Sequence, residues 1–290
     1  MVGPHALSID VEHWYDATLA TRPAAAQPEF ARREIEAVLE LLAAHGAKAT
    51  FFVLGHLAQE LPASVRAIAD AGHEIGCHGM THDLLWQMGE QRFRHEVAAA
   101  KAVLEDLTGH AVRGYRAATW SLDARSPWAP AALLDLGFTY DSSVFPLRTP
   151  LYGVAGAPLK PYRLRAGAGA LLELPPAVGS LLGLRVPFAG GMYWRLLPTG
   201  LVLGGLRGEG TRVLYAHPWE VAPGGWSLPA SSGVVARFSM GFGRRHLRQV
   251  LLGLLRQVTF LPLGLVAAKL PDDQLEDWTF VDGSLVRSGH

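Results

Sequence analysis

Residues 64–82 read SVRAIADAGHEIGCHGMTH and contain, in one stretch, the pattern that decides the fold. Residues 64–71 have the composition and spacing of a helix, and Gly72 is placed to end it. Residues 73–77 have the pattern of a short buried strand, which His78 follows directly. A helix joined to a strand by a tight turn predicts a parallel α/β sheet. In such a sheet, functional residues lie at the carboxyl ends of the strands.

The same alternation extends outward from this stretch. Residues 5–9 predict a buried strand that ends at Asp10, and residues 48–54 predict a further strand. Residues 29–45 and 90–107 have the apolar spacing of helices. The expected fold class is therefore α/β, with Asp10 and His78 each at the end of a strand.

The second half of the chain is less regular. Residues 146–191 are rich in Pro and Gly, so we expect a loop-rich insertion with short strands at the mouth of the sheet. Residues 212–216 predict a late core strand that ends at His217, and residues 246–255 predict a closing amphipathic helix. We expect one domain over residues 1–260 and a C-terminal tail over residues 261–290, whose polar segment from Pro271 packs loosely.

Composition limits the classes of function. The 290 residues include 26 basic and 26 acidic side chains, a balance that disfavours a nucleic-acid partner. The single cysteine, Cys77, cannot form an intrachain disulfide, and its strand-like neighbours indicate a core position. The sequence has neither the pattern of a signal peptide nor an apolar run long enough to span a bilayer, so we expect a cytoplasmic protein. The high hydrophobic fraction, 49%, leaves peripheral contact with the inner membrane as an alternative.

Two carboxylates follow the first predicted strand, in the pattern Asp10-Val11-Glu12. In extended chain, residues i and i+2 point to the same side, so one carboxylate can bind a metal while the other holds a proton. Such a pair is also common on solvated loops, and it does not define a site alone.

Two histidines follow another strand, in the pattern His78-x3-His82. This spacing brings two imidazoles to one face of a turn or helix, which suits a divalent metal. The alternative is a solvated loop with two incidental histidines. Two histidines and one carboxylate leave coordination positions open, as in catalytic rather than structural zinc sites.

An arginine and a further histidine lie after other predicted strands. Arg116 beside a catalytic carboxylate would keep that carboxylate ionised and fixed in direction. His217 could serve as a general acid at neutral pH. A surface arginine and a structural histidine are the alternative interpretations, and a lone histidine is more often structural. Trp14, Trp120 and Trp219 lie near these motifs and suit either sugar rings or the core.

These residues belong to a set of motifs in which the chain resembles the polysaccharide deacetylases of the NodB-homology, carbohydrate esterase type. The motifs are residues 8–14 (SIDVEHW), 49–55 (ATFFVLG), 71–82 (AGHEIGCHGMTH), 114–117 (GYRA), 136–143 (LGFTYDSS) and 217–220 (HPWE). They occur in family order and span roughly residues 6–260. The resemblance is strongest to the branch associated with exosortase and exopolysaccharide loci.

The resemblance implies a distorted, incomplete (β/α)7 TIM-like barrel and a metal-dependent N-deacetylase of N-acetylhexosamine units. The metal implied is Zn²⁺, with Co²⁺, Ni²⁺ or Mn²⁺ as alternatives. It implies a glycan substrate and an association with exopolysaccharide assembly. The missing signal-peptide pattern favours action on the glycan before export.

The resemblance also implies roles for individual residues. His78, His82 and an acidic group hold the metal, Asp10 is the general base, and Arg116 holds Asp10 in place. A backbone N–H near Thr119 meets the oxyanion, and His217 is the general acid. Asp141 is a candidate for orienting His217.

The chain departs from the family pattern at three places. Val11 occupies the position of a second aspartate, so Glu12 is the candidate ligand in its place. His13 stands where related sequences carry an acid, and Ala118 replaces a proline. Two other functions stay open: a metal-dependent amidase acting on a small or cyclic amide, and a non-catalytic glycan-binding subunit.

Overall fold

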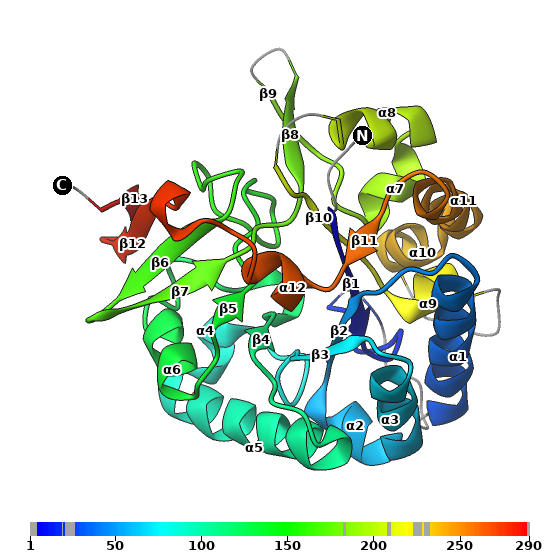
Figure 1. The fold of residues 1–290 in the computed structure, drawn as a ribbon, viewed down its shortest axis with the longest axis horizontal. Coiled ribbons are helices and arrows are strands. Elements are labelled where there is room, and N and C mark those ends of the chain that lie inside the picture. Colours follow the sequence, from blue (N-terminus) through cyan, green and yellow to red (C-terminus); the bar gives the residue numbers. More distant parts are fainter. Residues whose placement is uncertain are drawn as a thin grey trace.

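A parallel sheet forms the centre of the molecule (Figure 1). The computed structural model describes residues 5–18, 20, 27–181, 184–207, 210–222, 228 and 233–288. Five parallel strands lie side by side in chain order: β1 (His5–Val11), β2 (Thr50–Val53), β3 (Glu74–Cys77), β4 (Gly114–Tyr115) and β5 (Tyr140–Asp141). On its other edge β1 pairs in parallel with β10 (Val213–Ala216). The strand predicted directly before His217 is thus β10, and it lies next to β1.

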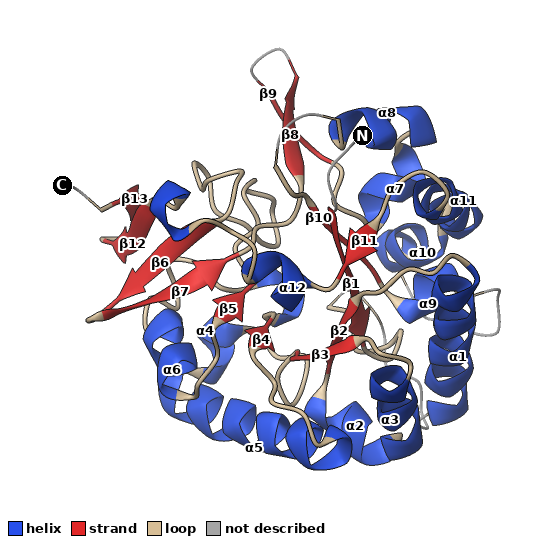
Figure 2. Ribbon diagram, viewed as in Figure 1, coloured by secondary structure: helices blue, strands red, loops and turns tan. Residues whose placement is uncertain are grey.

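Helices cover the outer face of these strands (Figure 2). They are α1 (Pro28–Ala44), α2 (Gly55–Glu60), α3 (Pro62–Asp70), α4 (Leu85–Met88), α5 (Glu90–Thr108) and α6 (Ala129–Asp135). The predicted helices α1, α3 and α5 are confirmed within a few residues. In α1 the apolar stripe that includes Ile35, Val38 and Leu42 is buried against the sheet.

Residues 146–191 contain two hairpins, consistent with the prediction of short strands among loops. The antiparallel pair β6 (Tyr162–Ala166) and β7 (Gly169–Glu173) joins the sheet through β5. The pair β8 (Val178–Leu181) and β9 (Leu184–Pro187) forms a separate hairpin. The helices that follow are α7 (Met192–Leu196), α8 (Thr199–Gly205), α9 (Pro218–Val221), α10 (Val234–Gly241) and α11 (Arg244–Leu255).

The barrel is incomplete between β7 and β10. Single bridges cross this gap, from Pro176 to Val213 and from Gly190 to Tyr215. Two backbone hydrogen bonds support them: the N–H of Ala177 donates to the carbonyl of Val213 at 2.9 Å, and that of Tyr215 to Ala189 at 2.8 Å. The expected distorted, incomplete barrel is confirmed.

The C-terminal segment is better ordered than the sequence predicted. Strand β11 (Phe260–Leu261) pairs with β1, and α12 (Leu263–Ala267) packs under the barrel, where the N–H of Leu263 donates to Thr50 Oγ1 at 2.7 Å. After η2 (Asp272–Gln274), strands β12 (Asp277–Val281) and β13 (Ser284–Arg287) form a hairpin that extends the sheet beyond β6. The prediction of loose packing from Pro271 was wrong, since Leu285 of β13 is buried in the main core. The other residues of the hairpin are half-buried or exposed, so its sequence lacks the apolar alternation of a core strand.

None of the described helices is long and apolar enough to cross a membrane.

Candidate metal centre and active site

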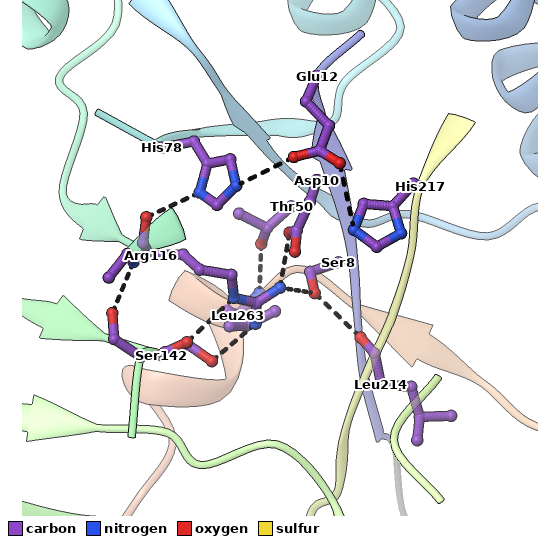
Figure 3. Close-up of polar contacts among 12 residues, drawn as sticks. Ser8, Asp10, Glu12, Thr50, His78, Arg116, Ser142, Leu214, His217 and Leu263 are labelled. Carbon is purple, nitrogen blue, oxygen red and sulfur yellow. Dashed lines mark hydrogen bonds and ion pairs between the residues drawn. The ribbon is translucent and has the colours of Figure 1, made fainter. Parts of the chain in front are cut away.

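Three parallel strand ends deliver the candidate residues to one place (Figure 3). Asp10 lies near the end of β1 and Glu12 directly follows it. His78 directly follows β3, and His217 directly follows β10. Asp10 and Glu12 are each only 2% exposed, so both carboxylates are withdrawn from solvent and need partners.

Glu12, His78 and His82 form a cluster with the donor atoms of a metal site. Their ligand atoms all lie within 4.8 Å of one another. Glu12 Oε2 lies 2.9 Å from His82 Nε2 and 3.9 Å from His78 Nε2. Among the described residues, this oxygen accepts no hydrogen bond of good geometry. A buried carboxylate oxygen that faces two imidazole nitrogens without a hydrogen bond fits a bound divalent cation.

The orientation of His78 supports this interpretation. Its Nδ1–H donates to the backbone carbonyl of Arg116 at 2.8 Å, which leaves the lone pair of Nε2 directed toward Glu12. A backbone carbonyl that fixes the ring in this way is a usual outer partner of a metal-bound histidine. Burial lowers the pKa of His78 to about 4, so the ring is neutral, the state in which imidazole binds a metal. Burial opposes ionisation of Glu12, but the surrounding histidines, with His82 foremost, lower its pKa to about 2.

Asp10 is held by a buried arginine on one side of this cluster. Arg116 Nη1 donates to Asp10 Oδ1 at 2.7 Å and to Ser8 Oγ at 2.5 Å. The rest of the guanidinium donates to Ser142, at 3.0 Å to its carbonyl and 2.7 Å to its hydroxyl. Arg116 is fully buried, and its guanidinium lies 4.4 Å from the ring centre of Phe52. The contact predicted between Arg116 and Asp10 is therefore present.

His217 is held by a carboxylate on the other side. Its Nδ1–H donates to Glu220 Oε2 at 2.7 Å, while its Nε2 lies 3.8 Å from Glu12 Oε1. Glu220 also forms a short ion pair with Arg195 from α7, and Arg195 donates to the carbonyl of Ser239 at 2.6 Å. Burial would lower the pKa of His217, but the carboxylates of Glu220 and Glu12 raise it to about 9. His217 is thus held as a cation beside the cluster.

The prediction that Asp141 orients His217 was wrong. Asp141 is fully buried, and its Oδ1 accepts a hydrogen bond from Ser143 Oγ at 2.5 Å. Ser143 Oγ in turn accepts the N–H of Ala117 at 2.8 Å, so Asp141 supports the backbone next to Arg116 instead. Burial raises the pKa of Asp141 and that of the neighbouring Glu173, which favours the protonated form of these carboxyls.

The sequence prediction missed Glu220 and Arg195. Glu220 had a recognisable signal: it stands three residues after His217, and the two residues form a capping box at the start of α9. Arg195 had none, because it lies in a segment without periodicity and meets Glu220 only in the folded chain.

The four predicted substrate-binding residues divide into two groups. Thr119, Trp120 and Trp219 line the cavity that opens onto Asp10 and the cluster. Trp14 is 2% exposed, packs with Trp219 in a small core cluster and is not among the described residues that line this cavity, so its prediction as a sugar platform was wrong. Its position beside the motif is explained by packing.

The cavity wall near Thr119 has an unusual backbone. Thr119 and Trp120, in η1 (Ala118–Trp120), have φ angles of 52° and 46°, a left-handed conformation that costs non-glycine residues about 1–3 kcal/mol each. Such strain is typical of functional sites, where the surrounding structure fixes the direction of a peptide group. The backbone donor expected near Thr119 stays a prediction.

Comparisons with known proteins agree with this architecture. A model of the family "Polysaccharide deacetylase" matches residues 28–140, and a model of a domain of unknown function (DUF3473) matches residues 142–267. The chain is 37% identical over 79 residues to a peptidoglycan-N-acetylglucosamine deacetylase of Bacillus cereus, which covers 27% of this chain and 29% of the relative. It is 35% identical over 107 residues to a chitooligosaccharide deacetylase of Sinorhizobium fredii, covering 36% and 50%.

Solved structures extend the likeness over the whole fold. A crystal structure from Mycobacterium smegmatis, provisionally assigned as a polysaccharide deacetylase, has a TM-score of 0.61 at 25% identity and covers 99% of this chain and 94% of that one. The Puue allantoinase has a TM-score of 0.59 at 16% identity, covering 91% and 89%, and shows the fold alone. The chain spans half or less of the length of the two curated relatives named above. These matches fit the polysaccharide deacetylase family: residues 28–140 match its model directly, and the whole fold resembles a solved structure assigned to the same class.

Proposed function

We propose that the chain is a divalent-metal-dependent N-deacetylase that hydrolyses the acetamido group of N-acetylhexosamine units in a polysaccharide or its precursor. The observation that carries the proposal is the arrangement in Figure 3, in which Asp10, His78 and His217 lie around Glu12. Asp10 is bonded to Arg116, and His217 Nε2 lies 3.8 Å from Glu12 Oε1. Amide hydrolysis needs a base for water and an acid for the departing amine, and these two residues have the matching chemistry.

Glu12, His78 and His82 would hold the metal. Zinc is the first candidate, since the donor set is two imidazoles and one carboxylate, and Co²⁺, Ni²⁺ or Mn²⁺ suit the same donors. The chemistry supplied by a bound ion would be Lewis-acid activation of the acetyl carbonyl and of water. Asp10 is less suited as a ligand than Glu12, because Arg116 already occupies one of its oxygens.

Asp10 and His217 would move the protons. With Oδ1 of Asp10 bonded to Arg116, its second carboxylate oxygen can accept a proton from the attacking water. His217 would donate the proton on Nε2 to the amine nitrogen, because Glu220 fixes the opposite face of the ring through Nδ1. Thr119 and Trp120 would complete the wall that meets the acetyl oxygen and the sugar.

The setting we propose is the trimming of a glycan in exopolysaccharide assembly. Deacetylase names among the relatives, for peptidoglycan and chitooligosaccharide, support a glycan substrate class. The rival functions, an amidase for a small or cyclic amide and a non-catalytic glycan-binding subunit, make different predictions in a single assay.

The decisive assay is acetate release from chitooligosaccharides by metal-stripped protein, with and without added Zn²⁺ or Co²⁺. We expect release only with metal, loss of release in His78→Ala, and normal release in His110→Ala, whose histidine is exposed and outside the site. Release from a cyclic amide but not from glycans would overturn the proposal in favour of the amidase. Glycan binding without release from either the glycan or the cyclic amide would overturn it in favour of the binding subunit.

A further inference from the structure

A second cluster of histidines and acids lies close to the candidate site. His13 and Asp16 belong to the loop after β1, and His56 belongs to the first turn of α2. Ligand atoms of these three residues all lie within 4.8 Å of one another. The side chain of Asp16 is fully buried, that of His13 is 2% exposed, and that of His56 is 30% exposed. The cluster is thus enclosed, with His56 at its opening to solvent.

The hydrogen bonding of His56 matches that of His78 in the first cluster. His56 Nδ1–H donates to the carbonyl of Met80 at 3.0 Å, which turns Nε2 toward Asp16 Oδ2 at 3.2 Å. In the neutral ring with this tautomer, Nε2 has a lone pair that faces a carboxylate oxygen. Two facing lone pairs repel each other unless a proton or a cation lies between them, and the same geometry joins His78 to Glu12.

His13 is oriented by a carboxylate of its own. Its Nε2–H donates to Glu60 Oε2 at 2.8 Å, and its ring stacks on Tyr15 with 4.6 Å between centroids. Histidines that bind metals commonly donate one ring N–H to a carboxylate, which fixes the ring and makes it a better donor. The cluster therefore has two oriented imidazoles, one buried carboxylate and a further carboxylate at its edge.

We propose that His13, Asp16 and His56 form a second divalent-metal site, distinct from the cluster of Glu12, His78 and His82, that takes zinc or a similar ion. Its role is structural. It ties the loop after β1, which begins at Glu12, to α2, and thereby fixes one ligand of the first site. Glu60 or water completes the coordination.

The test is metal content measured by mass spectrometry after stripped protein is reloaded with Zn²⁺ and desalted. We expect two equivalents in the wild type, one in His56→Gln and one in Asp16→Asn. Glutamine at position 56 keeps a donor for the Met80 carbonyl, and circular dichroism verifies folding. The control His110→Gln keeps two equivalents. One equivalent in the wild type, unchanged in His56→Gln, would overturn the proposal.

The same measurement separates this proposal from the catalytic one. His78→Ala should lose the other equivalent, leaving one ion that His56→Gln then removes in the double variant. Two equivalents without acetate release would contradict only the proposed function, and acetate release with one equivalent would contradict only the second site.

A second inference concerns the exposed apolar side chains of helix α10. Helix α10 exposes three large apolar side chains, Val234 at 83%, Val235 at 69% and Phe238 at 49%, and Phe242, directly after the helix, is 48% exposed. We call these four side chains the α10 surface. The rings of Phe238 and Phe242 stack with 4.9 Å between centroids. Ala236 and Met240 of the same helix are buried. An exposed apolar face of this size on a short helix indicates a binding surface.

The charge around α10 indicates the chemistry of the partner. The stretch from residue 221 to 271 contains no Asp or Glu, although the chain as a whole is neutral. Its cationic side chains are Arg237, Arg244, Arg245, Arg248, Arg256 and Lys269. Of these, Arg237, Arg245 and Arg248 are exposed on α10 and α11. Apolar and basic side chains together are typical of helices that lie in the interface of an anionic membrane.

We infer that the α10 surface docks on an anionic lipid bilayer. Ser239 and Met240 of α10 line the cavity of the candidate site, so docking would bring that cavity close to the lipid surface. If the proposed function holds, the substrate reached from there is a lipid-linked glycan.

Sedimentation with vesicles tests this second inference. We expect binding to phosphatidylcholine vesicles that contain phosphatidylglycerol, weak binding to phosphatidylcholine alone, and a loss of about tenfold in Phe238→Ser/Phe242→Ser. The control Leu184→Ser, at an exposed residue of the β8–β9 hairpin, should bind normally. Equal sedimentation of wild type and double variant, or none with either vesicle, would overturn the inference. The assay contains no glycan, so it is independent of the proposed deacetylation.

Discussion

The two sides of the candidate site hold their reactive groups by different means. On one side the Arg116 guanidinium bonds Asp10 directly, and among the described residues it also donates to two serine hydroxyls and a carbonyl. On the other side Arg195 bonds Glu220, and Glu220 bonds His217. Both arginines are buried, at 0% and 4% exposure.

The difference follows from the charge that each reactive group needs. A base must stay negative, so one buried cation beside it is sufficient. An acid must stay positive, which requires a buried anion, and that anion needs a cation of its own. The side with His217 therefore has one more residue, Glu220, between its arginine and its reactive group. We expect this side to lose less stability when its arginine is removed.

The largest expected effect is on the base side. In metal-loaded Asp10→Asn we expect acetate release to fall by about a thousandfold, because the isosteric amide cannot accept the proton. Metal content should be unchanged, since Glu12 rather than Asp10 faces the two histidines. Measured loss of metal from this variant would instead make Asp10 the ligand.

Removal of each arginine compares the two sides in stability. Arg116→Met leaves Asp10 buried without its cation, and we expect a loss of about 3–5 kcal/mol in the free energy of unfolding. Arg195→Met leaves Glu220 with His217 still bonded to it, so a smaller loss of about 1–3 kcal/mol is expected. Urea unfolding at pH 7 measures both. Equal losses would refute the proposed difference between the sides.

A pH-dependent effect is expected behind the acid side, at Glu34 of α1. Burial raises the pKa of Glu34 to about 8, although the nearby Arg244 opposes the shift. Since the pKa is higher in the folded than in the unfolded chain, Glu34 lowers stability as pH rises from about 4.5 to 8. Glu34→Gln should therefore be more stable than wild type at pH 8, by roughly 2–4 kcal/mol, with the gain absent at pH 4. Thermal unfolding at both pH values checks the sign.

Loss of the carboxylate that holds His217 should be milder than loss of the base. We expect Glu220→Gln to reduce kcat by about 10–100-fold and to move the alkaline limb of the pH–rate profile to lower pH. The shift follows because Glu220 is the foremost of the charges that raise the pKa of His217. A slower enzyme with an unshifted profile would give Glu220 a packing role only.

The smallest effect is expected at Ser142. Ser142→Ala removes one hydroxyl acceptor of Arg116, at 2.7 Å, while its carbonyl continues to accept from Nε. A loss of about 1 kcal/mol in stability and a change in kcat of less than tenfold are expected. Chemical unfolding and the acetate assay measure the two. A loss as large as that of Arg116→Met would mean that the hydroxyl, rather than the guanidinium, organises the base side.

The contrast between the two sides also explains what could be predicted from the sequence. Asp10, His78 and His217 were identifiable because each lies at the end of a short apolar strand, and parallel strands place such ends together. The pairing of Glu12 with His78 and His82 followed from short local spacings. Arg195 and the true position of Asp141 depend on contacts between segments distant along the chain, which no local pattern encodes. The burial of Trp14 likewise depends on α10, which packs against it from the second half.

Arg116 contacts both Asp10 and His78. Its side chain bonds Asp10, its own carbonyl bonds His78, and its N–H donates to the carbonyl of Cys77 at 3.0 Å. The distance between Asp10, the proposed base, and His78, a proposed metal ligand, is therefore set through Arg116 and cannot be adjusted at one end alone. Anyone who transplants this centre to another barrel would have to carry the 116–117 peptide and its serine supports as a single component. Copying the reactive side chains without it would reproduce the composition of the centre and lose its spacing.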